Sequence, residues 1–319
     1  MDLLLLILML ALGFAVLLGG GEALVRGATR LSRSLQISPL IIGLTVVAFG
    51  TSLPEFAVNL IASFNGSTEM AFGNVMGSNM ANIGLIAALT ALILPLKISP
   101  KIATNEMPFL FLLTSITLIL AFFSNSDEFG SVEGAVLVGL LLVFLYRTIK
   151  QGRNDPQEIY GRQKDSSNAN THLLKSIGFI IVGAIALILG AHLIVVGGQG
   201  LAEHFGIPES IIGLAVLAVG TSLPELTASL VSAFRGHPDL AIGNIIGSNV
   251  LNLAFVLGVV ALVQPVAIPS SGGIADIIAV LFLTFVLWAI VFWRHELRRS
   301  HGIFLLVFYI GYIGLRFRF

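Results

Sequence analysis

The chain has 319 residues, of which 56% are hydrophobic and 11% charged, and 17 basic residues balance 17 acidic ones. Soluble domains carry about 25% charged residues, so an ordinary soluble domain is excluded, and the zero net charge removes the electrostatic case for nucleic acid. The absence of cysteine excludes disulfides, thiolate metal sites and cysteine nucleophiles. This composition indicates an all-α integral membrane protein.

Ten apolar segments are candidates for membrane-spanning helices, which need about 20 apolar residues each. In chain order they lie near 3–21, 38–64, 69–95, 108–123, 131–147, 176–198, 208–234, 239–264, 274–292 and 301–316. The polar stretch 148–175 separates the first five segments from the last five and is predicted to be a loop. We therefore expect an N-terminal five-helix unit (1–147), a linker (148–175) and a C-terminal five-helix unit (176–319).

Lysine and arginine cluster in alternate connections between these segments. Of the 17 basic residues, all but Arg316 and Arg318 lie in or at the edges of the connections after the first, third, fifth, seventh and ninth segments. The first of these predicted loops contains Arg26, Arg30 and Arg33. Because basic loops stay in the cytoplasm, we expect a multi-pass protein of the cell (inner) membrane with both termini outside and the central loop cytoplasmic.

The two halves contain a repeated segment. Residues 41–86 align without a gap onto residues 211–256, and about half of the positions are identical. Duplication for packing alone would preserve the apolar pattern rather than Glu, Asn, Ser and Thr. Five spans per half would place the second copy in the opposite orientation. We therefore expect ten transmembrane helices as two inverted repeats, with the repeated motifs near 38–95 and 208–264 meeting at the midplane.

Each copy places one glutamate, Glu55 or Glu225, inside an apolar segment with no Lys or Arg at the same depth. A carboxylate at the bilayer centre costs about 2.5–3.5 kcal/mol on insertion scales. Two such groups at equivalent positions are expected to meet between the repeats. Without a counter-ion in the protein, they need a mobile cation or bound protons.

Hydroxyl groups share a helix face with both glutamates. Thr51 and Ser52 lie four and three residues before Glu55. The second copy repeats this arrangement with Thr221, Ser222 and Glu225. These hydroxyl groups are predicted to be ligands of the same cation as the carboxylates.

A proline in each GTSLPE motif, Pro54 or Pro224, is predicted to break its helix. Proline cannot donate to the carbonyl four residues earlier and pushes it aside. Backbone oxygens around Ala48–Gly50 and Ala218–Gly220 would then face a ligand, since irregular backbone is tolerated at this depth where it lines a cavity. A simple proline kink is the alternative.

The neighbouring segments carry the motif GNxxGSNxxN in both copies. Residues four apart form a polar stripe on each helix, and four of them are predicted to be cation ligands: Ser78, Asn82, Ser248 and Asn252. For the remaining amides, ligation and interhelical hydrogen bonding are equally good interpretations; these are Asn74, Asn79, Asn244 and Asn249. We expect the four helices with these two motifs (second, third, seventh and eighth) to be broken at the midplane.

All these donors are hard oxygen atoms, which select Na⁺, Ca²⁺ or Mg²⁺ over Zn²⁺ or Cu²⁺. Two carboxylates balance one Ca²⁺, and a flexible set of six to eight oxygens suits Ca²⁺ better than octahedral Mg²⁺. The site residues with the strongest case as metal ligands are Glu55, Glu225, Thr51 and Thr221. His192, at the position of Glu22 in the first half, is expected to be a packed interior residue, with gating or proton handling as the alternative.

The paired motifs resemble the two α-repeats of the sodium/calcium exchangers, within the cation/Ca²⁺ exchanger superfamily, and the chain looks most like the compact prokaryotic members. The resemblance implies Na⁺ and Ca²⁺ as transported ions, no cofactor and no obligatory protein partner besides the lipid bilayer. It implies a shared role for Glu55 and Glu225 and carbonyl ligands at Ala48 and Ala218. It also implies alternating access by sliding of the first and sixth helices.

The resemblance further implies exchange of three Na⁺ for one Ca²⁺, so that one net charge crosses per cycle, worth ~2.3 kcal/mol per 100 mV. Asn252 stands where certain members have aspartate, and Asn82 is its neutral equivalent. Potassium-dependent relatives tend to be acidic there, so we expect no K⁺ requirement. The same difference leaves the Na⁺ stoichiometry open.

Three other functions compete with a Na⁺/Ca²⁺ antiporter. A Ca²⁺/H⁺ antiporter could use the same two glutamates to carry protons, although H⁺/Ca²⁺ exchangers usually carry a GNxxE-type motif. A cation channel could also be built from inverted repeats. An intramembrane hydrolase would need a nucleophile with a positioned base, and the repeats contain no such Ser–His or aspartate pair. We therefore expect a transporter and not an enzyme.

Overall fold

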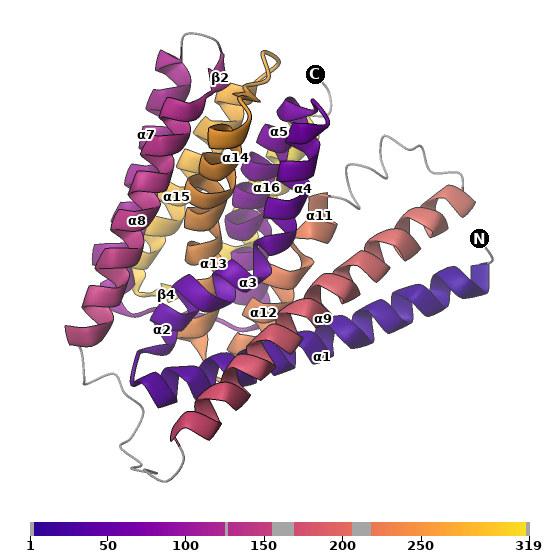
Figure 1. Ribbon diagram of the computed structural model, residues 1–319, viewed down its shortest axis with the longest axis vertical. Coiled ribbons are helices and arrows are strands. Elements are labelled where there is room, and N and C mark those ends of the chain that lie inside the picture. Colours follow the sequence, from indigo (N-terminus) through magenta and orange to yellow (C-terminus); the bar gives the residue numbers. More distant parts are fainter. Residues whose placement is uncertain (1–2, 125–126, 155–168, 206–217, 317–319) are drawn as a thin grey trace.

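The computed structural model describes residues 3–124, 127–154, 169–205 and 218–316. They form a bundle of helices with two short antiparallel strand pairs (Figure 1). Within these residues, 7 helical segments are long and apolar enough to cross a membrane, or 8 when one bent pair is taken as a span. Helices lie at all ten predicted apolar segments, of which 208–234 is described only from Ala218 onward.

The elements follow the chain in two halves. The first half contains α1 (Leu3–Leu35), α2 (Pro39–Ile42), the π-helical η1 (Gly43–Val47), α3 (Ala48–Thr51), α4 (Leu53–Phe64), α5 (Thr68–Ala81), the π-helical η2 (Asn82–Ala87), α6 (Ala88–Ile93), β1 (Leu96–Lys97), the π-helical η3 (Ile102–Glu106), α7 (Met107–Phe123), β2 (Glu128–Phe129) and α8 (Ser131–Asn154). The second contains α9 (Ala169–His204), α11 (Ala218–Thr221), α12 (Leu223–Phe234), α13 (Pro238–Leu251), the π-helical η6 (Asn252–Leu257), α14 (Gly258–Val263), β3 (Val266–Ala267), α15 (Gly273–Arg294), β4 (Glu296–Leu297) and α16 (Arg299–Arg316).

Helix α1 is longer than the predicted segment 3–21. It continues to Leu35, so Arg26, Arg30 and Arg33 are helical and the prediction of a loop there is wrong. The chain has no proline between residues 22 and 35, and arginine is a good helix former. The predicted linker 148–175 is likewise helical at both ends, and its middle, 155–168, lies outside the described residues.

Helices α1 and α9 lie side by side as a long pair at one edge of the bundle (Figure 1). Glycines seven residues apart line their contact. A Cβ atom at Gly183 would lie 2.5 Å from the Leu24 nitrogen, and one at Gly190 would lie 2.6 Å from the Leu17 nitrogen. Residues seven apart share a helix face. The two backbones therefore touch along several turns, which makes the α1–α9 pair a tightly packed unit.

The centre of the remaining bundle is α13, whose residues from Leu240 to Leu251 are all buried. It crosses the segment α2–η1 at a pair of glycines. A Cβ atom at Gly43 would lie 2.7 Å from the Leu240 carbonyl oxygen, and one at Gly243 would lie 2.7 Å from the Leu40 carbonyl oxygen. This backbone contact brings α3, which follows η1, against the polar residues of α13.

The helix that contains GTSLPE bends at the predicted place. Between Pro39–Thr51 and Leu53–Phe64 the axis turns by 43°, and Ser52 leaves helical geometry with φ −86° and ψ 2°. In the second copy Ser222 adopts φ −92° and ψ 3°. Both serines are followed by a proline in the first turn of the next helix, where its missing N–H is tolerated.

The helices that contain GNxxGSNxxN differ from the prediction. Instead of breaks at the midplane, the segments 69–95 and 239–264 have the π-helical stretches η2 and η6, through which the helices continue. These stretches begin at Asn82 and Asn252. A π-helical turn inserts one residue and disturbs the hydrogen-bond ladder without ending the helix. The prediction of a broken third and eighth helix is therefore replaced by a local widening at the two asparagines.

Two strand pairs connect the halves at opposite ends of the bundle (Figure 1). β1 pairs with β4, with Lys97 opposite Glu296, and β2 pairs with β3, with Glu128 opposite Ala267. In each pair one strand comes from the first half and the other from the second half. The β1–β4 end contains Lys97 and the arginines around β4, whereas Asp127 and Glu128 lie at the β2–β3 end.

Candidate cation site

The two predicted glutamates lie in the interior, where α3 and α4 of the first half meet α12 and α13 of the second. Glu55 and Glu225 are each 1% exposed. The hydroxyl of Ser52 donates a hydrogen bond to Oε1 of Glu225 at 3.2 Å. A bend residue of one repeat therefore contacts the central carboxylate of the other.

Hydroxyl and amide groups surround the two carboxylates. The hydroxyl of Thr51 lies 3.2 Å from the Ala48 carbonyl oxygen and 3.3 Å from Oδ1 of Asn244, and it can donate to one of them at a time. The Ala48 oxygen also accepts from the backbone N–H of Ser52 at 3.0 Å. The predicted carbonyl ligand at Ala48 is therefore engaged by protein donors, and it would bind a cation fully only if Thr51 turned toward Asn244.

Many of the predicted ligand atoms make no hydrogen bond to any described residue. These atoms are both carboxylate oxygens of Glu55, Oε2 of Glu225, the hydroxyl oxygens of Thr221, Ser222 and Ser248, and both amide atoms of Asn82 and Asn252. A buried polar group without a partner costs about 1–3 kcal/mol or more, and such groups are rare in folded proteins. Their concentration around two carboxylates indicates a place for a ligand that oxygen atoms recognise.

Ser78 occupies the same stripe as Asn82 and donates to the carbonyl of Asn74 at 2.7 Å. Its oxygen keeps acceptor capacity, as does that of Ser52, because a hydroxyl has two lone pairs. Both hydroxyls can therefore still coordinate a cation. The residue equivalent to Ala48 in the second half, Ala218, begins α11, and its side chain lies outside the described part.

Asn244 has the clearest positioning role among the amides that the sequence left open. Its Nδ2 donates to the Glu225 carbonyl at 3.3 Å and to the Ser229 hydroxyl at 3.0 Å, while its Oδ1 faces Thr51. Asn79 and Asn249 donate to the carbonyls of residues four earlier, at 2.8 and 2.7 Å. The two-way contact of Asn244 connects the glutamate helices of both repeats.

Two further polar residues escaped the sequence analysis. Asn59 donates to the Glu55 carbonyl at 2.6 Å, and Ser229, at the equivalent position of the second copy, is 0% exposed. Both lie four residues after their glutamate, so a polar residue at this position in both copies was the available signal. Asn59 thereby holds the backbone of the Glu55 turn, and the Ser229 hydroxyl accepts from Asn244 beside Glu225.

The charge of the two glutamates is not matched by an amino-acid cation in the described part of the chain, where the ion pairs lie elsewhere. That part also contains no group of three or more His, Cys, Asp or Glu residues that could hold a metal. The arrangement therefore consists of two carboxylates and many neutral oxygens, which favours a weakly held hard cation over a tightly bound transition metal.

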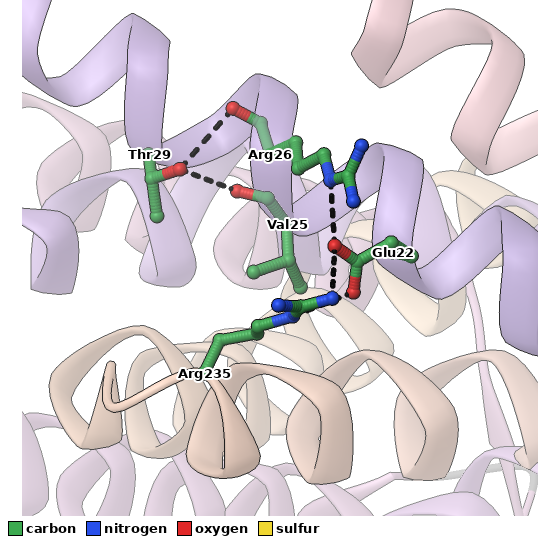
Figure 2. Close-up of polar contacts among 5 residues, drawn as sticks. All are labelled: Glu22, Val25, Arg26, Thr29 and Arg235. Atoms are coloured by element: carbon green, nitrogen blue, oxygen red, sulfur yellow. Dashed lines mark hydrogen bonds and ion pairs between the residues drawn. The ribbon is translucent and has the colours of Figure 1, made fainter.

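A separate polar cluster connects α1 to the end of α12 (Figure 2). Glu22 of α1 accepts hydrogen bonds from Nε of Arg26 at 2.6 Å and from Nε of Arg235 at 2.8 Å. Nη2 of Arg235 lies 2.7 Å from Oε1 of Glu22, the oxygen that also accepts from Arg26, whereas Nε of Arg235 contacts Oε2. His192 is exposed on α9, so the prediction that it packs in the interior is wrong, because its side of α9 faces away from the bundle.

Comparison with known proteins identifies the family. Residues 5–150 and 175–318 match the family described as "Sodium/calcium exchanger protein". The CaxA protein of Alkalimonas amylolytica is 35% identical over 310 residues, covering 96% of each chain. The sodium/calcium exchanger MaX1 of Methanosarcina acetivorans is 29% identical over 97% of this chain and 98% of its own.

The solved structures agree. A structure of the sodium-calcium exchanger NCX_Mj, soaked with 10 mM Na⁺ and no Ca²⁺, superposes with a TM-score of 0.85 at 29% identity, covering 98% of this chain and 99% of its own. The fold and site therefore define a multi-pass membrane antiporter. The chain belongs to the sodium/calcium exchanger family and is of the compact prokaryotic type.

Proposed function

We propose that this protein is a secondary active antiporter that exchanges Na⁺ for Ca²⁺ by alternating access, electrogenically and without K⁺. The observation that carries the proposal is the set of buried, unpartnered oxygens around Glu55 and Glu225, to which both halves of the chain contribute. Two carboxylates neutralise one Ca²⁺. The same oxygen atoms are hard ligands that also suit Na⁺. Neutral Asn82 and Asn252 provide no added charge for K⁺.

The proposed ligand set contains Glu55, Glu225, Thr51, Ser52, Thr221, Ser222, Ser78, Ser248, Asn82, Asn252 and the carbonyls of Ala48 and Ala218. The strongest ligands are expected to be the two carboxylates, with Thr51 and Thr221 beside them. Asn244 is proposed to position both glutamate helices. Exchange needs no cofactor and no partner other than the bilayer.

The proposed architecture is ten transmembrane helices in two inverted repeats, 1–147 and 176–319, joined by 148–175. Two observations support it: each strand pair takes one strand from either half, and the bends at Ser52 and Ser222 have nearly the same dihedral angles. The cluster of basic residues at the β1–β4 end supports a cytoplasmic location of that end. We propose the inner membrane, since the similar protein YrbG of Escherichia coli is named an inner membrane protein.

The test is Ca²⁺ uptake into proteoliposomes loaded with Na⁺ and diluted into Na⁺-free buffer, with matched arms for a pH gradient and for K⁺. We expect uptake that requires internal Na⁺, is unchanged by K⁺ and increases with an inside-positive voltage. The two buried carboxylates could instead carry protons, and uptake that follows the pH gradient would establish a Ca²⁺/H⁺ antiporter. Flux that is coupled to neither gradient would indicate a channel and refute the proposal.

The Glu22–Arg235 contact provides a test of sliding by the α1–α9 pair. If α1 moves relative to α12, this contact must break, whereas Glu22–Arg26 lies within one helix and persists. Exposed ion pairs contribute about 0.2–1 kcal/mol, so Arg235→Gln should change the balance between access states by up to about fivefold. Arg26→Gln, which leaves the inter-helix contact intact, is the control.

The measurement is the labelling rate of a single cysteine introduced beside the cation site. Labelling is specific to that position because the native chain contains no cysteine. We expect Arg235→Gln and Glu22→Gln to change this rate in the same direction, with no further change in the double variant. Equal effects of Arg26→Gln and Arg235→Gln would show that the contact does not distinguish the access states.

A further inference from the structure

An apolar cavity of about 660 Å³ lies between α9 and the bundle. One wall is formed by Ile181, Ala184 and Ile185 of α9. The opposite wall comes from the segment that leads into the bend at Ser52, including Thr45 and Phe49, and from Leu145 of α8. The cavity therefore lies between part of α9 and the segment that leads to the proposed ligands Thr51 and Ser52.

The chemistry of the walls excludes a polar ligand. Thr45 contributes the only polar side chain among the lining residues, and its hydroxyl already donates to the Ile41 carbonyl at 2.6 Å. A water molecule in a cavity needs two to four polar partners, and apolar cavities stay dry. A cavity of this size matches those that hold small organic ligands. The walls therefore match only an apolar group, such as a hydrocarbon chain.

The cavity also borders the lipid-facing surface. Among its lining residues, Phe49 is 44% exposed, Ile181 53% and Ile185 52%. These residues belong to elements whose length and apolarity fit a membrane span, so bilayer hydrocarbon lies directly against them. We propose that one acyl chain of a membrane phospholipid enters the cavity from the side and fills the space between α9 and the segment Thr45–Leu53.

This role rests on the proposed function: if the α1–α9 pair slides, a bound acyl chain lies at the interface across which it slides. A Cβ atom at Gly50 would lie 3.6 Å from the Ala184 methyl carbon, so α9 approaches the helix of Thr51 and Ser52 closely at the edge of the cavity. Beyond that point the two elements are held apart. The acyl chain completes the packing there with a flexible group that leaves the α1–α9 pair free to shift.

The experiment counts phospholipids retained by the full-length protein after detergent purification, by native mass spectrometry, with a phospholipid of defined acyl chains added back. Ala184→Phe and Leu145→Trp fill the cavity from opposite walls. Val182→Phe is the matched control, because Val182 is 62% exposed on the same helix and does not line the cavity. Monodispersity and Ca²⁺-dependent thermal stabilisation report that each variant is folded.

We expect the wild type and Val182→Phe to retain one phospholipid per chain, and both cavity-filling variants to lose at least nine-tenths of it while they stay folded. Equal retention by all four proteins would overturn the proposal, as would a folded wild type that retains none. Retention of detergent or free fatty acid in place of phospholipid would also overturn it. Loss of the phospholipid in Val182→Phe alone would place the lipid on the outer surface of α9 and would likewise overturn the proposal.

Discussion

Glutamine at position 55 or 225 is expected to abolish Na⁺-dependent Ca²⁺ uptake. Each substitution keeps the shape of the side chain and removes one of the two charges that would neutralise Ca²⁺. Removing one partner of a buried charge pair costs about 3–5 kcal/mol, which corresponds to a loss of affinity on the order of 100-fold or more. Uptake by proteoliposomes measures the effect, and Glu69→Gln is the control because Glu69 is exposed at the start of α5.

The stability of the same variants separates a lost ligand from a misfolded protein. The carboxylate oxygens of Glu55 lack partners among the described residues, so glutamine should leave the ion-free protein as stable as the wild type or more so. Saturating Ca²⁺ should raise the wild type's thermal stability, by about 2.7 kcal/mol at 100 times the Kd, and should not stabilise the variants. Normal Ca²⁺ stabilisation in either variant would contradict the assignment of these glutamates as ligands.

Leucine at Gly190 is expected to separate α1 from α9 and to eliminate transport. A Cβ atom there would lie 2.6 Å from the Leu17 nitrogen and 2.9 Å from the Gly13 carbonyl oxygen. These are backbone atoms, which cannot rotate away as a side chain could, so the helices must move apart. Overpacking typically costs 1–3 kcal/mol and occasionally more. We expect a lower melting temperature in detergent and little or no Ca²⁺ uptake.

Gly178→Leu is the matched control on the same helix, because nothing lies within 4 Å of its would-be Cβ atom. Leucine is a better helix former than glycine by roughly 1 kcal/mol, so this control should be as stable as the wild type or more so. Gly190→Leu should thus lower the melting temperature, whereas Gly178→Leu should leave it unchanged or raise it. On α1, Gly20→Leu and Gly19→Leu should repeat this contrast, because a Cβ atom at Gly20 would meet α9 and one at Gly19 would have nothing within 4 Å. Equal melting temperatures for the Gly190 and Gly178 variants would refute the close contact.

The sequence by itself determined the features that depend on local spacing and composition. Uninterrupted apolar stretches predicted where the helices lie, because a bilayer accepts only segments that satisfy their own backbone groups. Glu55 and Glu225 could be selected because an unpaired carboxylate in an apolar segment is costly. The bend at Ser52 followed from Pro54, whose ring and missing N–H act on residues within one turn.

The details that the sequence misjudged depend on propensity and on neighbours. The order of residues did not distinguish a helix break from the π-helical turns at Asn82 and Asn252. Both structures are compatible with polar residues spaced four apart in the motif GNxxGSNxxN. The end of α1 was placed too early because Arg26, Arg30 and Arg33 are as compatible with a helix as with a loop. His192 was assigned to the interior because apolar neighbours alone do not say which side of a helix faces the bundle.

Only the tertiary structure decided which distant residues meet. The contacts of Ser52 with Glu225, of Asn244 with both glutamate helices and of Glu22 with Arg235 join residues 173, 193 and 213 positions apart in the chain. Such pairs leave no local pattern, because their distance depends on how whole helices pack. Gly43 and Gly243 permit the packing that brings the two halves of the site together. The residue types of the site could thus be predicted from the sequence, whereas the geometry of the site depends on close backbone contacts between helices.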